Sequence, residues 1–172
     1  NQPQIALWNL AQFASALVPL MEDADAAVEE FTEIINRFVP RYQSAWLTVF
    51  GAKLGLRDAT EDDRPLIEGL LTRMAEDGAD FTRTFAALGQ DRARDEVTDR
   101  EAFDRWAGDW QARGPDAGLM ARSNPLVIPR NHLVEAAIAA AVADDLGPFR
   151  AMLAAVTDPF SDDGVHSRAP AA

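Results

Sequence analysis

The sequence of 172 residues contains no cysteine, one lysine, two histidines and one tyrosine. Without cysteine it can form no disulfide and offers no thiolate as a nucleophile or a metal ligand. Its longest apolar run, residues 136–143, has eight residues, whereas a helix that spans a bilayer needs roughly 20. Nothing resembles a signal peptide. These absences predict a cytoplasmic protein that does not bind membranes.

Basic residues are also scarce. The chain has 16 basic and 28 acidic residues, a net charge of −12, and Lys53 is its only lysine. Nucleic-acid binding depends on clustered Lys and Arg, so we expect no nucleic-acid partner. The acidity itself is interpreted as a solubility feature.

The histidines do not have the spacing of metal ligands. His132 and His166 lie in different contexts, and no His-x-x-x-His or Glu-x-x-His pattern occurs, which argues against a zinc or di-iron site. Glu29, Glu30 and Glu33 have no histidine partner and are expected to form a solvated helix face. His166 is expected to be a solvated residue of the C-terminal tail.

Motifs for phosphate binding and nucleophilic catalysis are missing. The sequence has no Walker or Rossmann glycine loop and no Gly-x-Ser-x-Gly elbow. Residues 51–55, Gly-Ala-Lys-Leu-Gly, lack a preceding strand and are expected to be a helix end. A carboxylate pair that meets only in the fold stays open. We therefore assign no catalytic, cofactor-binding or metal-binding residue.

What the sequence does contain is helical periodicity, with apolar residues three and four apart and no convincing strand. It predicts an all-α fold, a compact bundle of about six to eight helices, in a single domain over residues 1–160 with a tail over 161–172. The expected helices begin or end at caps, prolines and glycines. Pro19 should end the first helix, Pro65 should lie in the first turn of the fourth, and Gly78 should close the fourth. The helices lie near residues 5–19, 23–40, 42–51 or 42–55, 62–78, 80–88, 98–113, 131–143 and 148–157. The last of them carries an apolar stripe of Phe149, Met152, Leu153 and Val156.

Specific side chains are expected at helix ends and in the core. Asp80 should cap the helix that follows it, and Thr98 with Glu101 matches a capping box. The residues between positions 123 and 131, with two prolines four apart, should be extended or turning. Aromatic residues on apolar stripes are expected in the core. They are Trp8, Trp46, Trp106 and Trp110.

Arg130, Asn131 and His132 form the most distinctive polar cluster. In a functional interpretation, Arg130 binds an anionic ligand or a phosphorylated partner. In a structural interpretation, Arg130 pairs with an Asp or Glu, Asn131 caps the next helix and His132 is a satisfied residue at its start. We favour the structural interpretation.

Several segments together carry a family resemblance. They are "NQPQIALWNL" at residues 1–10, "YQSAWLTVFGAKLGL" at 42–56, "DFTRTFAAL" at 80–88, "NPLVIPRNHLVEAAIAAA" at 124–141 and "DPF" at 158–160. In order and spacing the chain resembles the C-terminal helical region of the selenoprotein O family, called YdiU in bacteria. Because the chain also begins at Asn1 rather than Met, we interpret it as part of a longer protein.

The resemblance implies a protein-kinase-like fold and a protein adenylyltransferase activity. Such an enzyme moves AMP from ATP, with Mg or Mn, onto Ser, Thr or Tyr hydroxyls of proteins. The family's ATP- and metal-binding motifs lie upstream of the segment that matches Asn1, so no catalytic residue is carried over and no cofactor is expected in this part alone. The implied partners are the missing N-terminal catalytic core and the protein substrates. Many family members have a selenocysteine or Cys near the C-terminus, and residues 161–172 contain neither, so the resemblance implies no redox control through that residue here.

Three functions follow as hypotheses. The first is a structural C-terminal region of an AMP transferase, inactive alone and cytoplasmic in bacteria. The second is a helical interaction module that recruits substrates or self-associates, which an exposed apolar patch would favour. The third is a free-standing all-α enzyme with an unrecognised carboxylate site.

Overall fold

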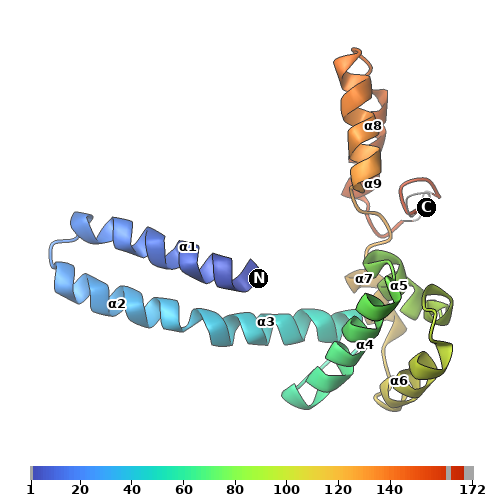
Figure 1. Cartoon of the computed structure of the whole chain (residues 1–172), viewed down its shortest axis with the longest axis horizontal. Helices are drawn as coiled ribbons and strands as arrows, with labels where there is room; N and C mark the ends of the chain where they lie inside the picture. Colours follow the sequence, from blue (N-terminus) through green and yellow to red (C-terminus); the bar gives the residue numbers. More distant parts are fainter. Residues whose placement is uncertain (1, 162–163, 169–172) are drawn as a thin grey trace. The chain divides into compact units, whose positions relative to one another are not determined.

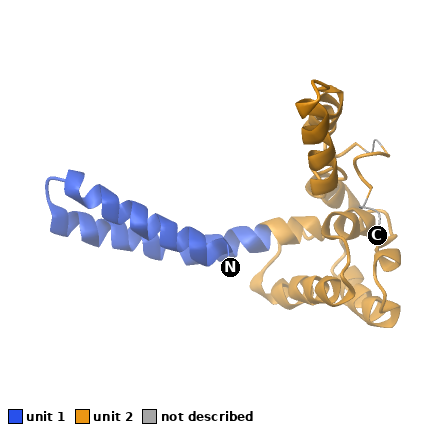
Figure 2. Cartoon of the chain, turned by 45° about the horizontal axis from the view of Figure 1, so that its top comes forward, with its two compact units in different colours: residues 1–48 blue, residues 49–172 orange. Residues whose placement is uncertain are grey.

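A computed structural model of the protein describes residues 2–161 and 164–168. These residues form helices and connecting segments, with no strand among them, which confirms the all-α prediction. The chain divides into two compact units, residues 1–48 and 49–172 (Figure 2). Each unit is described by itself, and the single domain over residues 1–160 stays a prediction.

The first unit is a helical hairpin. Helix α1 (Gln2–Leu17) is followed by the 3-10 turn η1 (Val18–Leu20), and α2 (Ala24–Asn36) runs back along it (Figure 1). Pro19 lies in the turn that ends α1, as predicted. Asp23 caps α2, because its Oδ1 accepts hydrogen bonds from the backbone N–H groups of Asp25 at 3.1 Å and Ala26 at 3.0 Å. The unit continues into α3 (Phe38–Lys53).

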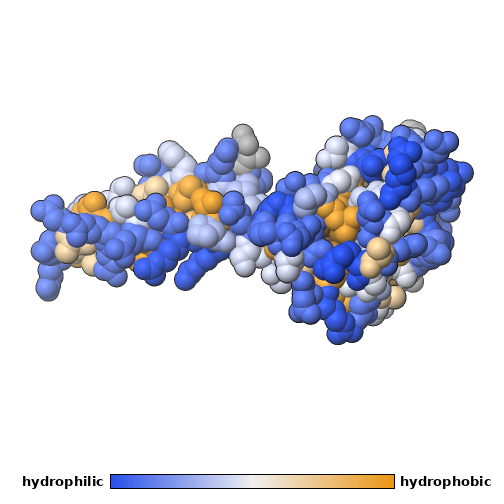
Figure 3. All heavy atoms as spheres, turned by 90° about the horizontal axis from the view of Figure 1, so that it is seen from below, coloured by the Kyte–Doolittle hydropathy of each residue, from blue (hydrophilic) through white to orange (hydrophobic). Residues whose placement is uncertain are grey.

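This hairpin buries little of its apolar surface. Among the described residues up to position 48, only Ala27 and Leu47 are buried. Trp8, expected in the core, is instead 62% exposed, and α1 has no buried residue at all. Trp46 is half-buried. Figure 3 shows apolar residues, in orange, at the surface of the hairpin on the left of the view.

The second unit contains the remaining helices. Pro65 lies in the first turn of α4, and Gly78, with φ of +63°, ends that helix in the left-handed conformation, both as predicted. Asp80 caps α5 through a 2.9 Å hydrogen bond from the backbone N–H of Arg83, again as predicted. The elements are η2 (Glu61–Asp63), α4 (Arg64–Asp77), α5 (Phe81–Leu88), η3 (Ala93–Glu96), α6 (Arg100–Ala112), α7 (Ala117–Ser123), α8 (Asn131–Val142) and α9 (Gly147–Thr157).

Two local predictions were wrong. The cap of α6 is Asp99, which accepts the backbone N–H of Ala102 at 2.9 Å, while the Thr98 hydroxyl instead donates to Asp77. The helix starts one residue later than the predicted box requires. Helix α7 was not predicted at all, because seven residues hold too few apolar positions to show a period.

Two stacked tryptophans form the centre of this unit's core. The rings of Trp106 and Trp110 lie 5.6 Å apart at 10° and are both buried, as predicted. Each indole N–H donates a 2.8 Å hydrogen bond to a backbone carbonyl, Trp106 to Leu66 and Trp110 to Leu54. The core therefore joins α6 to α4 and to the end of α3 without an unsatisfied indole.

Helices α8 and α9 form a second hairpin, side by side in Figure 1. The segment between α7 and α8 is extended, as predicted, and the N–H groups of Leu126 and Val127 donate to the carbonyl of Pro159 at 2.7 and 3.0 Å. These bonds tie the entry of α8 to the exit of α9. Of the predicted tail, residues 162–163 and 169–172 lie outside the described residues. No described helix has both the length and the hydropathy needed to cross a membrane.

Candidate functional site

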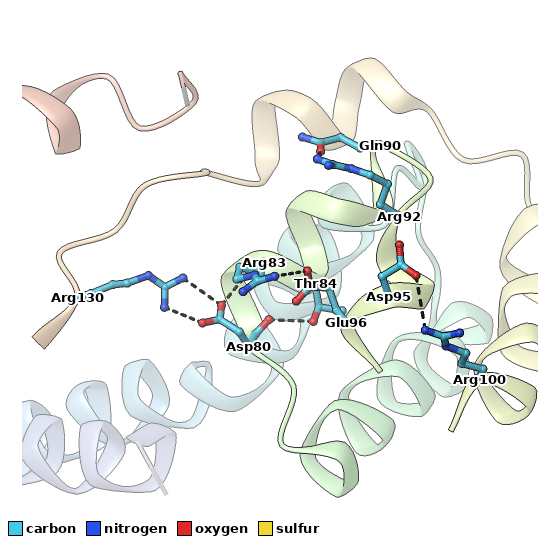
Figure 4. A network of polar contacts seen from close by, with 9 residues as sticks. All are labelled: Asp80, Arg83, Thr84, Gln90, Arg92, Asp95, Glu96, Arg100 and Arg130. Carbon is cyan, nitrogen blue, oxygen red and sulfur yellow. Dashed lines mark hydrogen bonds and ion pairs between the residues drawn. The ribbon is translucent and has the colours of Figure 1, made fainter. Parts of the chain in front are cut away.

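The polar cluster singled out in the sequence forms a buried ion pair. Arg130 Nη1 lies 2.6 Å from Asp80 Oδ2, and Nη2 lies 3.2 Å from Oδ1 (Figure 4). The Arg130 side chain is only 8% exposed. This two-point contact joins the segment before α8 to the start of α5. It confirms the structural interpretation of Arg130.

Asp80 has two roles in this contact, since it also caps α5. Burial opposes ionisation of its carboxyl group, but the hydrogen bonds from the Arg130 guanidinium and the Arg83 backbone outweigh burial and lower the pKa of Asp80. The carboxylate is therefore charged and paired with Arg130 near neutral pH. That leaves it unsuited to act as a general base.

The other two residues of the cluster differ from expectation in part. Asn131 is the first residue of α8 rather than its cap, and the capping position is Arg130, whose side chain makes no capping hydrogen bond. The backbone carbonyl of Arg130 instead accepts from Leu133 and Val134 at 2.9 and 3.0 Å. His132 is exposed at the surface of the first turn.

Beside this pair, a polar cavity of about 340 Å³ lies between α5 and η3. Arg83, in its wall, pairs with Glu96 at 2.8 Å, and Arg92 hydrogen-bonds with Gln90. Asp95 lies 3.9 Å from Arg100 (Figure 4). The wall therefore carries two arginines, Arg83 and Arg92, and two acids, Asp95 and Glu96, so the cavity offers a ligand no concentrated charge of one sign.

Lys53, the single lysine, is held at the end of α3. Its Nζ donates to the carbonyl of Ser123 at 3.2 Å and to Asn124 Oδ1 at 3.3 Å, and Asn124 Nδ2 donates back to the Lys53 carbonyl at 2.8 Å. The ammonium also lies 5.4 Å from the ring centre of Phe85. Burial lowers the pKa of Lys53. Through these contacts Lys53 connects the end of α3 to the end of α7. Residues 51–55 form a helix end, as predicted.

Asp63 is the buried carboxylate of the described residues, and it is fully paired. Its Oδ1 accepts from Arg113 Nε at 2.6 Å, and its Oδ2 accepts from Arg113 Nη2 and the Thr60 N–H, both at 2.9 Å. The guanidinium, helped by Thr60, lowers the pKa of Asp63. The group fastens η2 to the end of α6 and is not free for proton transfer.

The remaining candidates are the acidic residues of α2 and His166. Glu29, Glu30 and Glu33 are exposed on α2, as predicted, and Glu33 lies 3.5 Å from Arg37. His166 is half-buried rather than fully solvated. Within residues 2–161 and 164–168, no three His, Asp or Glu side chains gather closely enough to hold a metal ion.

The feature that sequence reasoning missed is an apolar groove between α8 and α9, with a volume of about 360 Å³. Every residue that lines it is apolar. The sequence predicted both helices and the α9 stripe, but not that the stripe lines an open groove. The available signal was composition, because Glu135 is the one charged residue of α8.

Comparisons with known proteins agree with the resemblance. The family model described as "Protein adenylyltransferase SelO" matches residues 1–157. Three similar proteins, each called "Protein nucleotidyltransferase YdiU", come from Roseobacter denitrificans, Ruegeria pomeroyi and Pseudarthrobacter chlorophenolicus. They are 52%, 47% and 42% identical over 95%, 96% and 94% of this chain. In each case the match covers 36% of the relative, so the chain spans about a third of the length of these proteins.

Proposed function

The chain belongs to the family of the protein adenylyltransferase SelO, and on that premise we propose that it forms the C-terminal helical part of a protein adenylyltransferase. The full-length enzyme would transfer AMP from ATP to Ser, Thr or Tyr hydroxyls of cytoplasmic proteins and would have a protein-kinase-like fold. The observation that carries the proposal is the family match over residues 1–157, together with relatives of which the chain spans 36%.

The chemistry of the described residues supports a structural role for this part. Phosphate-transfer catalysis needs a positioned cation, carboxylates and a divalent metal around the nucleotide. Here Lys53 binds backbone and amide oxygens, while Asp63 and Asp80 are each held by an arginine. We therefore assign ATP and Mg or Mn to the rest of the full-length protein.

An incorporation assay tests the proposal. The full-length protein and the 172-residue chain are incubated separately with ATP labelled at the α-phosphate, Mg or Mn, and a mixture of protein acceptors. We expect label on protein with the full-length enzyme and none with the chain. Label that appears when the γ-phosphate rather than the α-phosphate carries the isotope would indicate a kinase and contradict the proposal.

Calorimetry with ATP tests the assignment of this part. We expect the 172-residue chain to bind ATP too weakly to measure at micromolar concentrations. Low-micromolar affinity of the chain alone would place a nucleotide site within it and refute its purely structural role.

A second candidate, an interaction module, is favoured by the apolar groove between α8 and α9. It is compatible with the first, because a structural part can also bind other segments. The third, a free-standing all-α enzyme, gains no support from residues 2–161 and 164–168, where the buried carboxylate of Asp63 is bound by Arg113 at two positions. Finding a second carboxylate within reach of Asp63 in solution would restore it.

A further inference from the structure

The groove between α8 and α9 is built from two matching apolar stripes. On each helix the lining residues recur at positions i, i+3, i+4 and i+7, so each stripe follows one helix face. The residues are Val134, Ala137, Ile138 and Ala141 on α8, and Phe149, Met152, Leu153 and Val156 on α9, with Pro129 at one end.

Large side chains of the groove remain open to solvent. Ile138 is 58% exposed, and Phe149 and Leu153 are each 49% exposed. Ala137 and Met152, at the bottom, are buried and hold the two helices together. The two helices thus pack tightly at Ala137 and Met152, whereas the bulky apolar side chains at the edges of the groove are exposed to solvent in the described structure.

Helix α8 is apolar around nearly its whole circumference. Glu135 is its single charged residue, and five of its twelve positions are alanine. A helix of that composition is normally enclosed by protein on several sides. Helix α9 covers only one of those sides, so the hairpin has more apolar surface than it buries by itself.

The comparisons indicate what can cover it. The family model extends to Thr157, the last residue of α9, so the hairpin is part of the shared family region. The chain spans 36% of its relatives, which leaves about two thirds of each polypeptide outside this region. Side chains at helical spacing on two neighbouring helices form ridges with a groove between them. A third amphipathic helix can pack its own apolar side chains into such a groove.

We infer that the α8–α9 groove is the docking surface for an amphipathic helix from the rest of the full-length polypeptide. The inference rests on the proposed function only in requiring that such a polypeptide exists. The docked helix presents bulky apolar side chains at intervals of three and four residues. Asp144 and Asp145 lie in the turn at one end of the hairpin, so the helix is expected to carry Arg or Lys at that end.

Cysteine accessibility tests the inference cleanly, because the chain has no cysteine of its own. Leu153→Cys places a thiol in the groove. Ala151→Cys, on the exposed side of the same helix facing away from the groove, is the matched control. Both variants are made in the 172-residue chain and in the full-length protein, and maleimide labelling of each position is followed by peptide mass spectrometry.

We expect position 153 to react at least 10-fold more slowly in the full-length protein than in the chain, and position 151 to react at similar rates in both. Ile138→Cys, in the groove on α8, repeats the measurement if the first variant folds poorly. Equal reactivity of position 153 in the two proteins would show an open groove and overturn the inference. Protection of position 153 in the chain alone, with a doubled mass by light scattering, would show that a second copy is the occupant and would also overturn it.

Failure of the inference and failure of the proposed function give different results. Labelling at position 153 does not depend on AMP transfer, so an inactive full-length protein can still protect the groove. A native protein with a mass of only 18.8 kDa, the mass of this chain, would overturn both together.

Discussion

Single residues hold distant segments of the second unit together, and the Asp80–Arg130 pair is the most buried of these contacts. Arg130→Met removes the charge but keeps most of the side-chain volume, and leaves Asp80, 23% exposed, without its main partner. Breaking a buried pair costs about 3–5 kcal/mol, and the remaining water contact of Asp80 should reduce this to about 2–3 kcal/mol. Urea unfolding measures the loss.

Arg94→Met is the control for that measurement. Arg94 and its partner Asp104 are 48% and 51% exposed, so their pair should contribute less than about 1 kcal/mol. A similar loss in both variants would mean that the Arg130 pair is not buried in solution.

The same pair predicts a pH dependence. The pKa of Asp80 is lower in the folded protein than its ordinary value, so the pair stabilises the fold above that ordinary value, about 4, and the stabilisation is lost as the pH falls through the lower folded pKa. The difference in unfolding free energy between the wild type and Arg130→Met should be constant from pH 5 to 7 and shrink in acid. A difference that persists undiminished at pH 2 would contradict this.

Gly55 combines a left-handed backbone with close contact, and alanine should not be tolerated there. Its φ is +76°, and a Cβ atom would lie 2.7 Å from the backbone nitrogen of Asp116. Gly78, with φ of +63° and no atom within 4 Å of such a Cβ, is the matched control. Gly78→Ala should cost about 1–2 kcal/mol from backbone conformation alone. Gly55→Ala should cost at least about 3 kcal/mol, because the clash is with backbone. Equal losses in thermal unfolding would refute the contact.

At the scale of elements, two different capping arrangements are possible at the start of α6, and substitutions there can distinguish them. The structure assigns the cap to Asp99, whereas the sequence pattern favoured Thr98 with Glu101. Asp99→Ala should therefore destabilise the protein by about 1 kcal/mol. Glu101→Ala, which the other scheme would make costly, should change stability by less than about 0.5 kcal/mol. The reverse order in urea unfolding would restore the predicted capping box.

The elements also show how far the sequence predicts this fold. The cap of α5 and the glycine end of α4 were predicted because a capping residue lies within a few residues of the backbone it binds. Helix α7 was missed because its seven residues show no period. Contacts between residues far apart in the sequence were predicted only by type. Arg130 was expected to pair with an acidic residue, but only the fold shows that this residue is Asp80, 50 positions away.

The candidate site was less predictable than the fold. The periodicity of α9 correctly placed Phe149, Met152 and Leu153 on one face. It could not say whether that face meets the core of this chain or another segment, because an apolar stripe has the same spacing in both cases. Only the structure shows which residues of the stripe are buried: Met152 is buried, whereas the adjacent Leu153 is half exposed.

At the scale of the whole molecule, charged groups are satisfied within the chain to a greater extent than apolar groups are buried in it. The conspicuous charges of the second unit are paired internally, as with Asp63 and Asp80. Apolar side chains, in contrast, remain exposed on both hairpins, with Trp8 at 62% on the first and Ile138 at 58% on the second. Exposed apolar surface of this kind marks sites of further packing. This pattern favours a region whose charged groups are paired within the chain and whose exposed apolar faces pack against another segment.

Unequal burial predicts unequal local stability in the isolated chain. In α4, Ile67 and Leu70 are fully buried, whereas α1 has no buried residue. Two such side chains contribute about 3–6 kcal/mol, which corresponds to at least a 100-fold difference in the opening that exposes backbone amides to exchange. In hydrogen exchange followed by mass spectrometry, peptides of α1 should therefore exchange at least about 100-fold faster than peptides of α4. Equal protection would mean that α1 is covered, and a monomeric mass by light scattering would then rule out a second copy as the cover.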